Sequence, residues 1–254
     1  MSNKPQTALL LLLLASVVCF NRAEAQQFLT THNARSGAMG GLVLHRFGER
    51  GAGIDYRQGF MANGMADKAI WLSAPVHGSG QVGVHYSHYG NLDYHEQQLG
   101  AGYALRATEW LRIGASARWL HLGSSDSRYR PRQWLAAELL LHMEPSTSTS
   151  FEVAAGTRPW DSCARFHLRL GTTYRPVSQL LTALAVEQED RLRFRLGMEY
   201  GYEKHFFVRA GMHTAPVTFC FGLGIRYGHY AFDLAAEVHS VLGITPQTSL
   251  VLWF

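Results

Sequence analysis

Apolar and polar side chains alternate along most of this chain with a period of two residues. In the segment 191–202, Leu192, Phe194 and Leu196 fall on one face, whereas Arg193 and Arg195 fall on the other. This period is typical of a β-strand, whose successive side chains point to opposite faces, and it excludes a helix. Thirteen segments are predicted as strands on this basis: 68–76, 81–89, 93–105, 111–122, 133–143, 148–156, 163–174, 178–188, 191–202, 205–213, 217–227, 230–239 and 247–254.

The length of these strands indicates a membrane protein. Soluble sheets usually have strands of about 5 to 6 residues, whereas a tilted strand needs about 9 to 11 residues to cross a bilayer. We therefore predict an all-β fold, an antiparallel transmembrane β-barrel of the bacterial outer membrane, with outer-membrane lipid against its apolar face. A soluble barrel or sandwich that buries the apolar face is the alternative.

The connections between the predicted strands bear on strand number. If residue 254 ends in the periplasm, the connections of four residues or fewer fall on the periplasmic side, and the longer ones, among them 59–67, 123–132, 157–162 and 240–246, fall outside. Outer-membrane barrels have this asymmetry and an even number of strands. One more strand must then come from 42–58, where glycines interrupt the alternation. We predict fourteen strands, with twelve as the alternative.

The N-terminus has the pattern of a secretory signal peptide. Lys4 begins a short polar head, residues 8–20 are apolar, and Ala23 and Ala25 form a small-x-small cleavage site before Gln26. The apolar run is shorter than the ~20 residues of a spanning helix, which disfavours an uncleaved anchor. We predict a signal peptide at 1–25, a periplasmic N-terminal segment or small plug at 26–41, and the barrel at 42–254.

Composition excludes several classes of protein. The 254 residues are 47% hydrophobic and only 17% charged, with a mean hydropathy of -0.08, which is too apolar for a disordered chain and too polar for a helical membrane protein. The net charge is +4, but the basic residues are scattered, so no nucleic-acid partner is predicted. After residue 25 only Cys163 and Cys220 remain, and we expect two unpaired thiols rather than a disulfide framework.

The residues indicate no catalytic, cofactor or metal site. His85 and His88 would face opposite sides of one strand, and His205 and His213 would lie about 27 Å apart along another. The chain has no G-x-S-x-G, P-loop or C-x-x-C motif. We predict a protein that is not an enzyme, although isolated Ser, His and Asp residues on barrel strands could form a catalytic site without a local motif.

Arginines dominate the predicted lumen. The register that sets apolar residues outward turns nine arginines inward: Arg112, Arg118, Arg165, Arg169, Arg191, Arg193, Arg195, Arg209 and Arg226. It sets four carboxylates against them: Glu96, Glu199, Asp233 and Glu237. The excess of cations would favour a bound anion or an inserted acidic segment. The alternative, a structural ladder of arginine and carboxylate pairs, is favoured because buried arginine is normally paired.

Several segments together resemble a known family. They are ARSGAMGG at 34–41, GLGIRY at 222–227, YAFDLAAE at 230–237, HSVLGIT at 239–245 and the final SLVLWF. These segments resemble the PorV/PorQ group of Bacteroidetes outer-membrane proteins, which are related to the fatty-acid transporter FadL. The likeness covers the start of the mature chain and about its last fifty residues. The chain has GIDYRQ at 53–58 where that group usually carries Asn-Pro-Ala, so it would be a divergent member.

The resemblance implies two functions and leaves a third open. A PorV/PorQ-like protein would assist type IX protein secretion, with secretion components or their exported substrates as partners. A FadL-like protein would be a channel for hydrophobic or anionic small solutes, and a lipid-modifying barrel enzyme is the further alternative. Leu250, Leu252 and Phe254 resemble the C-terminal strand of bacterial outer-membrane barrels, whose terminal Phe is read by the barrel-assembly machinery.

Overall fold

The computed structural model describes residues 33–42, 50–76, 80–126, 128–160, 163–189 and 191–254, with the side chains of 158–160 and 163–165 excepted. The predicted signal peptide, including Ala23, Ala25 and Gln26, lies outside the described residues. So do the side chains of Cys163 and Arg165.

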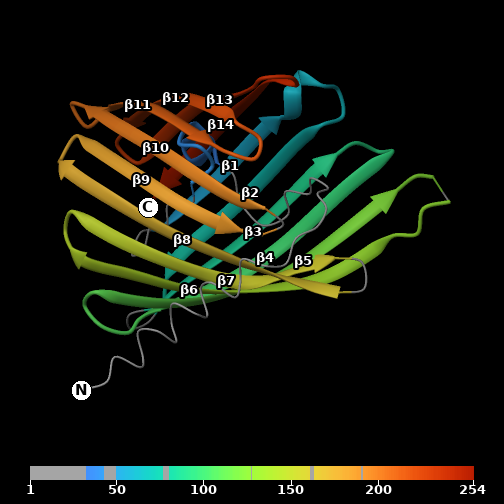
Figure 1. Cartoon of the computed structure of the whole chain (residues 1–254), viewed down its shortest axis with the longest axis horizontal. Helices are drawn as coiled ribbons and strands as arrows, with labels where there is room; N and C mark the ends of the chain where they lie inside the picture. The colour runs from blue at the N-terminus through green and yellow to red at the C-terminus, as the bar shows by residue number, and fades with distance from the viewer. Residues whose placement is uncertain (1–32, 43–49, 77–79, 127, 161–162, 190) are drawn as a thin grey trace.

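Fourteen antiparallel strands form one closed barrel. Figure 1 shows how the labelled strands follow one another around it. Each strand pairs with its neighbour in sequence, and β1 pairs with β14 to complete the ring. This confirms the predicted fold and the count of fourteen rather than twelve. The strands are β1 (Gly51–Gln58), β2 (Ala66–Pro75), β3 (Gly80–Gly90), β4 (Tyr94–Arg106), β5 (Leu111–Ser124), β6 (Arg132–Ser146), β7 (Thr149–Trp160), β8 (Cys163–Val177), β9 (Leu180–Gln188), β10 (Leu192–Tyr202), β11 (Phe206–His213), β12 (Thr218–Tyr227), β13 (Tyr230–His239) and β14 (Gly243–Trp253).

The strand faces follow the alternation of the sequence. On β10, the side chains of Phe194 and Leu196 are 47% and 50% exposed on the outer wall, whereas Arg195 between them is 6% exposed and faces the lumen. Closure pairs the edges of β1 and β14, the arrangement by which a barrel satisfies its backbone groups in hydrocarbon. No helix among the described residues has the length and apolar character to span a membrane.

Weak alternation in β1 has a packing cause. The indoles of Trp71 on β2 and Trp253 on β14 lie against this strand from the inside, with ring centroids 6.0 Å apart. A β-carbon at Gly51 would come 2.5 Å from the Trp253 ring, and one at Gly53 would come 2.5 Å from the Trp71 ring. Glycine is therefore required under both rings, and its absent side chain removes the pattern that marks the other strands.

All four loops expected outside are shorter than predicted, and the last two are shortened most. Strand β7 continues through 157–160, and β14 begins at Gly243 rather than at 247. The backbone pairs of β7 with β8 and of β13 with β14 extend to these positions, so ladder hydrogen bonds replace the expected loops. The longest connections between strands are 59–65, which contains the turn η1 (Gly59–Met61), and 125–131.

Candidate functional site: a plugged lumen

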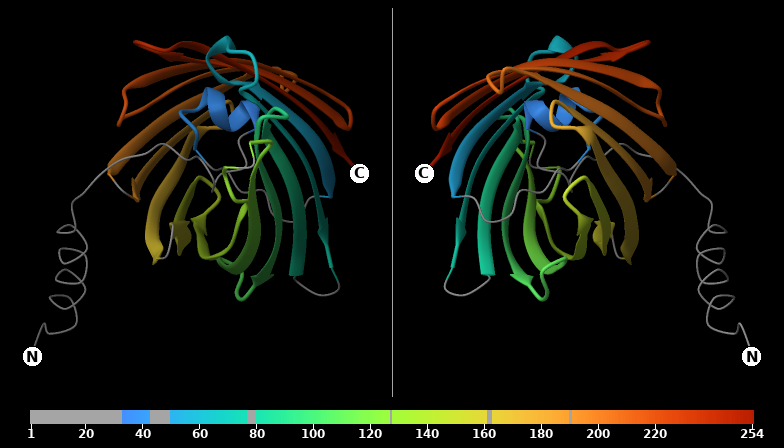
Figure 2. Two further views of the ribbon diagram at one scale, coloured as in Figure 1. Left: turned by 90° about the vertical axis from the view of Figure 1, so that its right-hand side faces the viewer. Right: turned by 90° about the vertical axis from the view of Figure 1, so that its left-hand side faces the viewer.

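A short N-terminal helix lies inside the ring of strands. Helix α2 (Ala34–Ala38) contacts β1 and β11 to β14, and Figure 2 shows it under the orange and red strands of the C-terminal half. Asn33 caps the helix by accepting a hydrogen bond from the Ser36 amide at 2.7 Å, and the Ser36 hydroxyl donates to the Leu42 carbonyl at 2.6 Å. We call residues 33–42 the plug, because they occupy the lumen that the strands enclose.

Glycines on three strands form the seat of the plug. A β-carbon at Gly197 would lie 2.6 Å from the Met39 carbonyl oxygen, and one at Gly222 would lie 2.5 Å from the Ala38 β-carbon. One at Gly211 would overlap the backbone of Met39 and Gly40. Because these contacts involve backbone or short side chains, the plug would have to move to admit any larger residue. The sequence ARSGAMGG suits this place, since its small side chains let two backbones approach closely.

Buried ion pairs hold the plug to the seat. The Arg35 guanidinium donates from Nε and Nη2 to the two oxygens of Glu199, both at 2.7 Å. Arg209 donates from Nε to the same Glu199 at 2.7 Å and from Nη1 to Asp233 at 2.6 Å. Arg195 donates to the Gly40 carbonyl at 2.9 Å. Charges taken out of water at such depth are tolerated only when they are paired and hydrogen-bonded, as these are.

The ladder of pairs continues around the lumen. Arg195 pairs with Glu187 at 2.9 Å, and Arg169 pairs with Glu152 at 3.0 Å. Glu138 accepts from His167 at 2.9 Å and from Arg118 at 3.5 Å. These contacts account for most of the inward cations and favour the structural interpretation of the lumen arginines over the anion-filled one.

The nine arginines named from the sequence occupy different places. Arg169, Arg195 and Arg209 are buried in the lumen ladder, whereas Arg191 is exposed in the loop before β10. Four are partly buried on inward positions of their strands: Arg112, Arg118, Arg193 and Arg226. Arg112 pairs with Glu144 at 2.7 Å near the end of the barrel. The side chain of Arg165 lies outside the described residues.

Several lumen charges were not predicted from the sequence. Glu138, Glu152 and Glu187 also face inward and are buried, so the expectation of four carboxylates was too low. Their strands carry Ala and Leu on the same inward face, which hid its polar character. Strict alternation from the neighbouring outward residues would have found all three. Arg35 lies in the plug and could not be placed by alternation at all.

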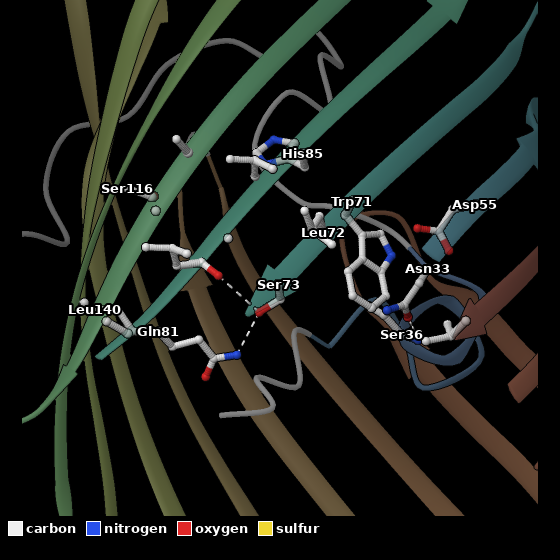
Figure 3. A pocket seen from close by; sticks show the side chains of 18 of the residues that line it. Asn33, Ser36, Asp55, Trp71, Leu72, Ser73, Gln81, His85, Ser116 and Leu140 are labelled. Atoms are coloured by element: carbon white, nitrogen blue, oxygen red, sulfur yellow. Dashed lines mark hydrogen bonds between the residues drawn. The ribbon is translucent and has the colours of Figure 1, made fainter. Parts of the chain in front are cut away.

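Two cavities flank the plug in the lumen. The first encloses about 340 Å³ and is lined by Trp71 and Trp253, by Arg35 of the plug, and by the inward faces of β2 to β5. Figure 3 shows the Trp71 indole beside Asn33 and Ser36 of the plug, and Gln81 donating to Ser73. The second encloses about 930 Å³ and reaches the end of the barrel that carries the turns at 107–110 and 147–148. Both volumes fall in the range of small-molecule sites.

The structure also places the candidate metal ligands, the cysteine and the C-terminal residues that the sequence analysis named. No cluster of three or more potential metal ligands occurs among the described residues. His85 faces the lumen, where its Nε2 lies 2.6 Å from Gln98 Nε2. Cys220 is a free thiol, buried against the backbone of Gly40. In the loop 125–131, hydrogen bonds from Arg128 hold the pKa of Asp126 below its usual value. Leu250, Leu252 and Phe254 are outward and 51%, 38% and 60% exposed.

Comparisons with known proteins show which fold this chain has but do not assign it to a family. No protein-family model and no curated protein matches the chain. Among solved structures, the CymD monoaromatic hydrocarbon channel matches with a TM-score of 0.64 at 13% identity, over 91% of this chain and 99% of that one. This chain therefore has the same fold as the CymD channel. The toluene transporter TbuX of Ralstonia pickettii matches at TM-score 0.61 and 14% identity (89% and 98% covered), and TodX of P. putida at 0.61 and 12% (89% and 99%).

Proposed function

We propose that this protein is an outer-membrane channel for small hydrophobic solutes, closed at rest by its N-terminal plug. The observation that carries the proposal is a closed barrel with an apolar outer wall and a plug bordered by two cavities of ligand size. The fold shared with hydrocarbon channels supports it. The location follows from the outer wall, because exposed Phe, Leu and Tyr around a closed barrel suit hydrocarbon and not water.

The first cavity suits an aromatic solute. The two indoles offer apolar surface and the edge and face contacts that aromatic rings prefer. Gly83, Gly102 and Gly114 also line this cavity, on β3, β4 and β5. A β-carbon at Gly83 would meet only the Leu72 carbonyl oxygen, at 3.8 Å, so this position can carry a large residue that projects into the cavity.

The PorV/PorQ part of the sequence interpretation stays a prediction. The channel alternative has the support of the fold, whereas a role with type IX secretion components rests on the resemblance of short segments alone. The absence of enzymatic activity also stays a prediction, with which the channel fold is consistent.

Uptake tests the channel directly. Cells that lack their own aromatic channel and express this chain should take up labelled toluene faster than cells without it. Gly83→Trp should remove most of this gain by filling the first cavity. Gly171→Ala, which changes a lumen glycine with no atom closer than 3.7 Å, should preserve it. Both variants should still run faster on a gel unheated than boiled, as closed barrels do. Uptake equal to that of cells without the protein would contradict the proposal.

A further inference from the structure

Arg226 occupies an unusual position between the two lumen cavities. It lies on β12 and lines both cavities, a place that it shares with Arg35 of the plug. Its guanidinium stacks over the Phe207 ring, with 4.8 Å from Cζ to the ring centroid, and Arg209 approaches the same ring at 5.5 Å. The side chain is therefore fixed in direction while it borders open space on two sides.

Arg226 differs from the other arginines of the first cavity in its charge partner. Arg35 is paired with Glu199, and Arg118 with Glu138. Among the described residues, no carboxylate or hydrogen-bond acceptor contacts the Arg226 side chain, and its buried Nε has no partner. Glu199 and Asp233 are near, but both oxygens of Glu199 accept from Arg35, and Asp233 Oδ1 accepts from Arg209. Three guanidinium groups thus face two carboxylates in this group of five side chains.

Asp55 is the one further carboxylate that the first cavity offers, and it does not neutralise Arg226. It lies on β1 and is 5% exposed, and its buried Oδ1 has no hydrogen-bond partner among the described residues. It forms no ion pair among the described residues. An arginine without a carboxylate partner in a low-dielectric cavity favours an anion brought from outside.

The surroundings of Arg226 specify the kind of anion. Guanidinium binds carboxylate through two parallel hydrogen bonds. The Arg226 guanidinium lies 4.8 Å from the Phe207 ring centroid, and no acceptor among the described residues occupies its terminal nitrogens. The cavity beyond it is bordered by Trp71 and Trp253 and is large enough for one ring. We propose that Arg226 binds the carboxylate of a small aromatic acid whose ring lies in the first cavity. This rests on the proposed channel function and names an anionic substrate class for it.

Binding to the intact protein in detergent tests the proposal. Equilibrium dialysis would compare labelled benzoate, its neutral analogue benzamide, acetate and toluene. Benzoate should bind roughly tenfold more tightly than benzamide, because a charge-assisted pair is stronger than a neutral hydrogen bond. Arg226→Met should remove this preference, and Arg226→Lys should retain part of it. Arg128→Met, which removes the same charge from an exposed loop, should leave the preference unchanged.

The outcomes separate this inference from the channel function. Equal binding of benzoate and benzamide, or a preference that survives Arg226→Met, would overturn the role of Arg226. Acetate binding as tight as benzoate binding would overturn the aromatic acid in favour of any small anion. If toluene binds and benzoate does not, the channel proposal stands and this one fails; if neither binds, both fail. Unchanged gel mobility of unheated Arg226→Met would show that the barrel still folds.

Discussion

Arg35 of the plug and Glu199 of β10 form a two-point ion pair, with Nε to Oε2 and Nη2 to Oε1 both at 2.7 Å. The two residues are 164 positions apart in sequence, so the pair joins the N-terminal segment to the barrel wall. Glu199 Oε2 also accepts from Arg209, which makes this carboxylate common to the plug and the lumen ladder. The strength of the plug's attachment should therefore depend on Glu199 more than on any peripheral carboxylate.

Glu199→Gln should loosen the plug. Removing one member of a buried ion pair leaves the other charge without compensation and typically costs about 3 to 5 kcal/mol. Since about 1.4 kcal/mol corresponds to a factor of ten, the unplugged population should rise by at least roughly a hundredfold. Planar-bilayer recordings should show little conductance for the wild type and frequent openings for the variant. Glu144→Gln, at a pair whose carboxylate is 41% exposed, should behave as the wild type.

The seat of the plug can be tested through a native thiol. Cys220 lies opposite Gly211 in the sheet, with a side chain that is 0% exposed and covered by Gly40. In a Cys163→Ser chain it is the one thiol after residue 25. Gly211→Ala should displace the plug, because the new β-carbon overlaps plug backbone, and a water-soluble maleimide should then label Cys220 much faster. Gly171→Ala is the matched control. Equal labelling rates in the two variants would mean that the plug does not depend on this seat.

Alternation was enough to predict the barrel but not its contents. A strict period of two in segments such as 192–202 determines the outward face of each strand. Closure then follows because a sheet in hydrocarbon can have no unpaired edge. Glu138 and Glu152 were within reach of the same rule and were missed because Leu and Ala share their inward face. The pairing of Arg35 with Glu199 was beyond it, since no local pattern relates a residue of the plug to one of β10.

The role of several glycines also could not be predicted from the sequence alone. In the sequence, Gly51 and Gly53 interrupt the alternation of a strand. In the structure they lie in contact with the rings of Trp253 and Trp71, where a β-carbon would clash. Their role depends on rings contributed by β2 and by β14, and β14 meets β1 only when the barrel closes. The same holds for Gly211 and the plug. Such positions could be recognised only once the strand order and register were known.

The C-terminal residue should matter for assembly more than for stability. Phe254 follows β14 and is 60% exposed, and its amide donates to the Arg50 carbonyl at 3.1 Å. Deleting it removes little packing, but it removes the aromatic end that the barrel-assembly machinery is expected to read. We predict less folded protein in the outer membrane with normal export across the inner membrane, measured by fractionation and unheated gels. Phe254→Tyr should restore the level. If the deletion leaves barrel levels unchanged, the residue serves only as another apolar side chain.

The depth of the outer wall in the membrane can be measured along β10. Leu196 lies in the middle of the strand and is 50% exposed on the outer wall, whereas Tyr202 is its last residue and is 57% exposed. An arginine on the lipid face costs about 2 to 4 kcal/mol near the bilayer midplane and about 0 to 1 kcal/mol near the interface. Leu196→Arg should therefore lower the free energy of unfolding in lipid vesicles by the larger amount, and Tyr202→Arg by the smaller. Equal effects at the two positions would show that the wall of β10 does not cross the hydrocarbon. By contrast, Arg195→Leu acts inside the barrel, where it removes the hydrogen bond to Gly40 and the 2.9 Å ion pair with Glu187, which keeps its more distant pair with Arg193 at 3.9 Å. It should destabilise the plug without changing the lipid-facing surface.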